Sequence, residues 1–166
     1  MPANNLDELF LDLLKDTYDA EKQLSKALPK LAKASTDENL KEAFESHLAE
    51  TEEQISRLEQ VFEMLEKPAR GKKCAGMQGL IEEGKEIIEE GMPEAVTDAA
   101  LIAAAQKCEH YEIAAYGTMA TFAKILGMND ALKLLKLTIG EEKAADEKLS
   151  KIAQAINYEA QEEVEA

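Results

Sequence analysis

The sequence predicts an all-α four-helix bundle, built from two antiparallel helical hairpins that a long crossover with a short helix connects. Apolar residues recur at steps of three and four along four long segments. Capping and turn residues separate these segments, and no segment alternates apolar and polar residues with the period of a strand. With a length of 166 residues, we expect a single domain over residues 1–166.

The first predicted hairpin consists of helices over about residues 6–34 and 37–66. Asn5 begins a capping-box pattern at the start of the first helix, and Asp37 caps the second helix after a short turn. Pro68 ends the second helix, because proline cannot continue the helical hydrogen bonding. The short turn makes the two helices antiparallel neighbours.

The second predicted hairpin follows a long connection that holds a shorter amphipathic helix over about residues 77–90. Helices over about 93–126 and 130–157 form this hairpin, with Gly127 at the turn, and residues 158–166 form an acidic tail. Two hairpins joined by one long crossover have the connectivity of ferritin-like bundles. The predicted fold is therefore a ferritin-like four-helix bundle.

The charge balance excludes several classes of partner. The chain has 19 Lys and Arg against 34 Asp and Glu, a net charge of −15, which repels nucleic acid and anionic membrane surfaces. The first residues lack the pattern of a signal peptide, and no apolar run is long enough to span a bilayer. Cys74 and Cys108 form no CxxC pair, and we expect both to be small core residues with free thiols. We expect a cytoplasmic protein that binds neither nucleic acid nor membrane.

The segment from Ala99 to Phe122 is apolar or small around nearly its whole helical circumference, yet it carries Glu109 and Glu112. A helix that is apolar on every side is expected to be buried. A buried carboxylate costs several kcal/mol unless a cation or hydrogen-bond donors compensate it. The sequence therefore predicts a positive charge beside this pair, either a metal ion or a salt-bridge partner.

Other helices offer companions for this pair. Helical periodicity turns Glu21 and Glu142 inward, and residues equally distant from a tight turn face each other across a hairpin. In the second helix both His47, near the centre of the apolar stripe, and Glu50, at its edge, are candidates. The predicted metal ligands are Glu21, His47, Glu50, Glu109, Glu112, Glu142 and Asp146.

Carboxylates from several helices, with an imidazole, form an oxygen-rich site suited to a di-nuclear Fe or Mn centre. Such a centre could oxidise Fe(II) or consume peroxide or O2. The alternative is a metal-free helical bundle that acts as a binding or assembly protein, with its carboxylates neutralised by protons or lysines. A storage shell is a third interpretation.

Four segments closely resemble the YciE/YciF-like bacterial stress proteins, a ferritin-like family. They are DTYDAEKQLSKALPKL (16–31), HLAET (47–51), DAALIAAAQKCEHYEIAAYGT (98–118) and LLKLTIGEEKAADEKL (134–149). The resemblance implies a rubrerythrin-like bundle, a cytoplasmic location, a homodimer and a link to stress responses.

The resemblance also implies a ligand pattern, which this sequence meets in part. Glu21 supplies the glutamate of the first helix, and Glu109 and Glu112 match the pair of the third. The second helix should carry Glu-x-x-His, but here His47 precedes Glu50, and the fourth helix carries an aspartate where a histidine is usual. A more carboxylate-rich site, weaker metal binding and a site that no longer binds metal all stay open. A redox-active centre would need a separate electron donor, because the chain has no rubredoxin-like Cys motif.

Overall fold

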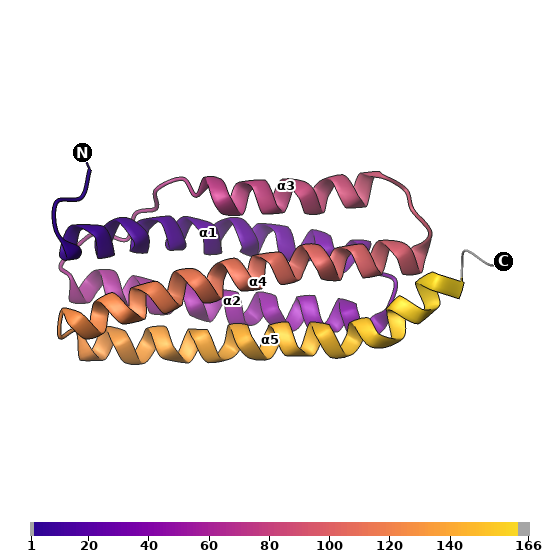
Figure 1. Ribbon diagram of the computed structural model, residues 1–166. Helices are drawn as coiled ribbons and strands as arrows, with labels where there is room; N and C mark the ends of the chain where they lie inside the picture. Colours follow the sequence, from indigo (N-terminus) through magenta and orange to yellow (C-terminus); the bar gives the residue numbers. More distant parts are fainter. Residues whose placement is uncertain (1, 163–166) are drawn as a thin grey trace.

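The computed structural model describes residues 2–162, which are helical apart from short connections. The helices are α1 (Leu6–Ala34), α2 (Glu38–Met64), α3 (Ala75–Glu89), α4 (Glu94–Ile125) and α5 (Asn129–Glu162). The long helices α1, α2, α4 and α5 run side by side as a bundle (Figure 1). Around this bundle α1 packs on α2, α2 on α5, α5 on α4 and α4 on α1. The predicted fold class is confirmed.

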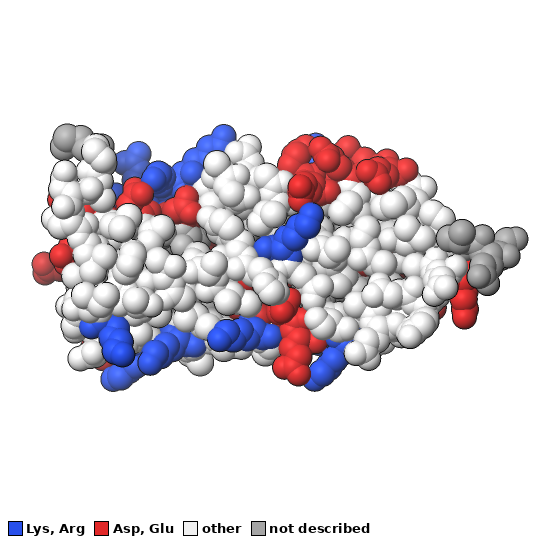
Figure 2. All heavy atoms as spheres, viewed as in Figure 1, with Lys and Arg blue, Asp and Glu red and all other residues white. Residues whose placement is uncertain are grey.

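The crossover helix α3 begins at Ala75, two residues earlier than the sequence predicts. A cysteine cap explains the difference, because the N–H of Met77 donates to Sγ of Cys74 at 3.4 Å. α3 packs on α1 and α4, and exposed glutamates form an acidic surface over its second half (Figure 2). The helix therefore covers the α1–α4 side of the bundle.

The turn between α4 and α5 falls at Gly127, as the sequence predicts. Gly127 has a φ of 73°, in the left-handed region that favours glycine. α5 then continues to Glu162, past the predicted end at residue 157, because Ile156 still packs in the core and the following residues favour helix. The last part of the predicted acidic tail, 163–166, lies outside the described residues.

Two apolar clusters fill the bundle. One includes Leu28 and Phe44, and the other includes Phe10 and Phe62. On each long helix, at least one buried glutamate or histidine lies near the boundary between the segments that form the two clusters. A polar layer therefore crosses the bundle near its middle. Among residues 2–162, no helix has the apolar length that a membrane crossing requires.

A buried aspartate fixes the α1–α2 hairpin against α4. The carboxylate of Asp98 accepts the backbone N–H groups of Thr36 at 2.9 Å and Asp37 at 2.8 Å. Asp98 is 3% exposed. Because α2 carries His47 and α4 carries Glu109, this contact helps to set the height at which the two helices meet.

Replacing Asp98 with alanine should lower the free energy of unfolding by about 1–3 kcal/mol, because two buried backbone donors lose a charged acceptor. Urea denaturation measures this change. The matched control is Glu94→Ala, which removes an exposed carboxylate from the first turn of the same helix and should cost less than about 1 kcal/mol. Equal losses in both variants would contradict a role of Asp98 in fixing the hairpin.

Candidate metal centre

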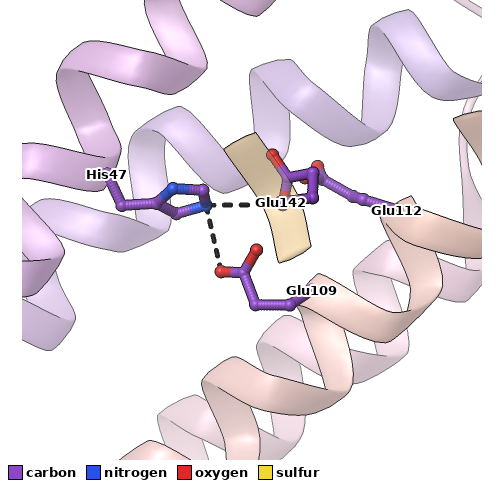
Figure 3. A group of neighbouring side chains, drawn as sticks. All are labelled: His47, Glu109, Glu112 and Glu142. Atoms are coloured by element: carbon purple, nitrogen blue, oxygen red, sulfur yellow. Dashed lines mark ion pairs between the residues drawn. The ribbon is translucent and has the colours of Figure 1, made fainter. Parts of the chain in front are cut away.

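The polar layer brings together four of the predicted ligands. His47 on α2, Glu109 and Glu112 on α4 and Glu142 on α5 offer ligand atoms that all lie within 4.8 Å of one another. His47 is 5% exposed, Glu109 is 2% exposed, and the other two are fully buried. Figure 3 shows His47 reaching from its helix toward the three glutamates. These residues form the four-residue cluster.

Glu21 joins the cluster from α1. Glu21 lies close enough to Glu112 for that residue to affect the pKa of its carboxyl group, and its Oε1 accepts the hydroxyl of Tyr116 at 2.5 Å. Glu21 is fully buried and Tyr116 is 1% exposed. Helical spacing places Tyr116 one turn after Glu112, but spacing alone cannot indicate that its hydroxyl reaches across to α1. All four long helices thus contribute to one polar layer.

Besides Glu21, two predicted ligands lie outside the four-residue cluster, and these two do not face its centre. Glu50 accepts a hydrogen bond from Nδ1 of His47 at 3.2 Å, and its side chain is 41% exposed. Asp146 lies 3.0 Å from Nε2 of His110, whose side chain is 68% exposed. Glu50 therefore contacts the nitrogen of His47 that faces away from the cluster, and Asp146 contacts the exposed His110.

The cluster contains many polar atoms without hydrogen-bond partners. They are both carboxylate oxygens of Glu112 and Glu142, one oxygen each of Glu21 and Glu109, and Nε2 of His47. That nitrogen lies 3.0 Å from Glu109 and 3.8 Å from Glu142, but it is aligned for a hydrogen bond with neither. Buried acceptors without donors are costly and therefore rare. The arrangement calls for protons or a cation at its centre.

Burial changes the proton affinities of the carboxylates. Loss of hydration, reinforced by the carboxylate of Glu109, raises the pKa of Glu142 to about 10. Loss of hydration raises the pKa of Glu21 to about 7, and together with the neighbouring carboxylates it raises the pKa of Glu112 well above its usual value. Without a metal ion, protons therefore neutralise part of the cluster at neutral pH.

The pair formed by His47 and Glu109 behaves differently. Burial disfavours the charged forms of both, but direct contact outweighs it. The carboxylates of Glu109 and Glu50 hold the pKa of His47 well above its usual value. Contacts with Glu142 and His47 lower the pKa of Glu109. Without a metal ion, this end of the cluster is an ion pair.

A second contact between α2 and α5 lies beside the cluster. Nη2 of Arg57 donates to Glu141 at 2.8 Å, and the amide of Gln54 donates to the same carboxylate at 3.2 Å. Sequence patterns do not predict this contact, because an arginine and a glutamate on helices usually indicate a solvated surface. The spacing of Gln54, three residues after the inward-facing Thr51, does indicate a polar side chain on the inner face of α2. In the structure Gln54 is fully buried.

The donor set fits a centre of hard metal ions. Four buried carboxylates and one imidazole nitrogen match the preferences of Fe and Mn, which take oxygen and imidazole ligands. Ferritin-like di-metal proteins build their centres from facing helices of a bundle in this way. Glu21, His47, Glu109, Glu112 and Glu142 are the residues that would hold such a centre.

The chain has clear relatives. It is 53% identical over 154 residues to protein YciF of Escherichia coli strain K12. The aligned residues cover 92% of this chain and 93% of that protein. The structure matches the crystal structure of the E. coli stress protein YciF with a TM-score of 0.91 and 52% identity, covering 94% of this chain and 99% of the other.

Two further solved structures are similar. YcfI of Rhodopseudomonas palustris matches with a TM-score of 0.87 and 44% identity, covering 89% of this chain and 94% of that one. A protein of Xanthomonas campestris pv. campestris matches with a TM-score of 0.77 and 21% identity over 97% and 99% of the two chains, which shows a shared fold. Residues 5–162 match the family described as a domain of unknown function, DUF892. The chain therefore belongs to the DUF892 family and is a homologue of YciF, as its resemblance to the YciE/YciF-like proteins predicts.

Proposed function

We propose that this protein is a ferritin-like stress-response protein that holds a pair of Fe or Mn ions in the middle of its bundle. The observation that carries this proposal is the set of buried, unpartnered carboxylate oxygens around Nε2 of His47. Four helices deliver these atoms to one place, and a cation compensates them better than any donor nearby. The link to stress comes from the E. coli relative, which is described as a stress protein.

The chain's own residues prepare the site for such ions. A proton on Nδ1 of His47, donated to Glu50, leaves the lone pair of Nε2 for the cluster. Tyr116 orients the carboxylate of Glu21 through its hydroxyl. The apolar clusters on both sides bury the layer, and their low polarity strengthens the electrostatic interactions inside it.

A pair of Fe(II) ions held by these residues would supply two electrons, which with two protons would reduce one hydrogen peroxide molecule to two water molecules or one O2 molecule to hydrogen peroxide. A separate electron donor protein would return the electrons.

The resemblance to YciE/YciF-like proteins supports two further parts of the proposal, a homodimeric assembly and a cytoplasmic location.

A second candidate function is a metal-free bundle that serves in binding or assembly. The raised pKa values of Glu112 and Glu142 support it, because protons can neutralise these carboxylates without any metal. A structural role has been suggested for the relative YcfI of R. palustris. The two candidates differ in whether metal ions replace these protons.

Anaerobic titration of chelator-treated protein with Fe(II) or Mn(II) should show saturable binding. Glu109→Ala should weaken this binding by at least about tenfold, because it removes a charged oxygen ligand from the cluster. The exposed Glu52 on α2 provides the control, and Glu52→Ala should bind as the wild type does. Absence of saturable binding, or equal binding by Glu109→Ala, would exclude the di-metal proposal.

Metal binding should release protons. At neutral pH the carboxyl groups of Glu112 and Glu142 hold protons, since their pKa values are raised, and these protons must leave when the oxygens bind a cation. Between pH 6 and 8 the apparent affinity should rise about tenfold per pH unit for each proton released. Calorimetry in buffers of different ionisation enthalpy measures the release. An affinity for metal that does not change with pH would contradict this assignment.

In the metal-free protein, Glu112→Gln should raise the free energy of unfolding at pH 8 by about 1–3 kcal/mol. The folded-state pKa of Glu112 lies above its unfolded value of about 4.3, so the folded state retains a proton that the unfolded state loses as the pH rises. Stability therefore falls above that pH by up to about 1.4 kcal/mol per unit, and the amide removes this loss.

Thermal unfolding measures the change at pH 5 and pH 8, with Glu52→Gln as the control. Mn(II) distinguishes the two candidate functions in the same experiment. Under the di-metal proposal it raises the melting temperature of the wild type and has little effect on Glu112→Gln. Under the metal-free alternative it changes neither.

A further inference from the structure

The interfaces between neighbouring helices of the bundle, here called seams, are closed in different ways. Short turns join α1 to α2 and α4 to α5, and α3 packs over the seam between α1 and α4. The opposite seam, between α2 and α5, is closed over part of its length by the contact of Arg57 and Gln54 with Glu141. Toward the N-terminus of α2 from Gln54, at Glu50 and the residues before it, α2 and α5 leave an opening between them.

The opening is a cavity of about 100 Å³ that leads from the surface to the four-residue cluster. Exposed Ser46 and Ala144 line its outer part, and buried His47 and Glu109 line its inner part. Ala43 and Ala145 add small side chains to its lining, and Phe44 and Leu149 complete its apolar wall. The alanines leave a gap beside these larger residues.

Unpartnered polar atoms belong to the inner end of this cavity. Nε2 of His47 and Oε2 of Glu109 have no hydrogen-bond partner, and both residues are more than nine-tenths buried. Glu21 and Glu112 do not line the cavity and are fully buried. The cluster is therefore accessible from one end, the end that holds the imidazole.

Two charged side chains also line the cavity. Glu50 is partly exposed and accepts the hydrogen bond of His47, so its carboxylate stands between solvent and the imidazole. Lys148 is exposed and brings a positive charge to the same lining. A cation that approaches along this cavity is attracted by the carboxylate of Glu50 and repelled by the ammonium group of Lys148.

We infer that this opening between α2 and α5 is the path by which divalent cations reach the cluster, with Glu50 as the carboxylate that receives them. The inference rests on the proposed function, since it concerns the route to the same site. Small side chains make the path passable, and the neighbouring Arg57–Glu141 contact keeps the two helices together beside it.

Stopped-flow mixing with Co²⁺ tests the path, because coordinated Co²⁺ absorbs visible light without undergoing redox chemistry. Ala145→Leu and Ala144→Leu fill the opening without touching a proposed ligand. A blocked path raises the barrier in both directions, so association and dissociation should slow by the same factor, about tenfold for each 1.4 kcal/mol of barrier. The dissociation constant should stay within about twofold. Ala155→Leu, at an exposed site on α5 outside the cavity, should change neither rate.

The charged residues provide a second test with opposite signs. Glu50→Gln should slow Co²⁺ association by about three- to tenfold, and Lys148→Gln should accelerate it by a similar factor, because one attracting or one repelling charge is lost near the path. Matched controls are Glu53→Gln and Lys151→Gln, which change exposed residues on the same helices outside the cavity. These two controls should bind at the rate of the wild type.

An equilibrium titration with Co²⁺ separates failure of the path from failure of the proposed function. If the wild type binds no Co²⁺ saturably, both are overturned. If it binds and both leucine variants keep wild-type rates, the path alone is overturned. If circular dichroism shows that the leucine variants do not fold, the charge variants decide, and association rates that Glu50→Gln and Lys148→Gln leave unchanged overturn the path.

Discussion

The cost of burying four carboxylates and an imidazole in one layer governs the rest of this structure. Each of these groups loses hydration on folding, and an unpaired buried charge costs several kcal/mol. The protein lowers the cost in two ways at different ends of the cluster. His47 and Glu109 form an ion pair, whereas Glu112 and Glu142 keep protons because their pKa values are raised. The folded state is thus compatible with an empty cluster.

This arrangement requires the helices to hold a fixed height, since every ligand atom of the four-residue cluster lies within 4.8 Å of the others. Apolar packing alone is tolerant of small shifts between helices, whereas a charged hydrogen bond specifies its partner. Asp98 ties the first hairpin to α4, and the contact of Arg57 with Glu141 ties α2 to α5. Both contacts join helices that carry different ligands, so they act on the geometry of the cluster.

The sequence could predict the fold and the centre of the cluster because both depend on periodicity. Glu109 and Glu112 lie in a mostly apolar segment, which predicts their burial, although α4 keeps one exposed face that carries Lys107 and His110. Glu50 and Asp146 lie near the edge of an apolar stripe, where the conformation of the side chain decides its partner and helical angle does not. In the structure Glu50 turns to Nδ1 of His47, and Asp146 turns to His110. The contact of Asp146 joins residues 36 apart in the sequence, and a contact at such a separation leaves no pattern in a single sequence.

The two ends of the cluster also differ in their access to solvent, and this difference bears on how protons and cations could exchange. Glu21, Glu112 and Tyr116 are sealed between the apolar clusters. His47 and Glu109 line the opening between α2 and α5. A proton that leaves Glu112 must therefore pass the ion pair to reach water, and a cation that arrives meets the ion pair first. His47 would have to lose one of its two ring protons to hold a cation, because imidazole binds metal only in its neutral form.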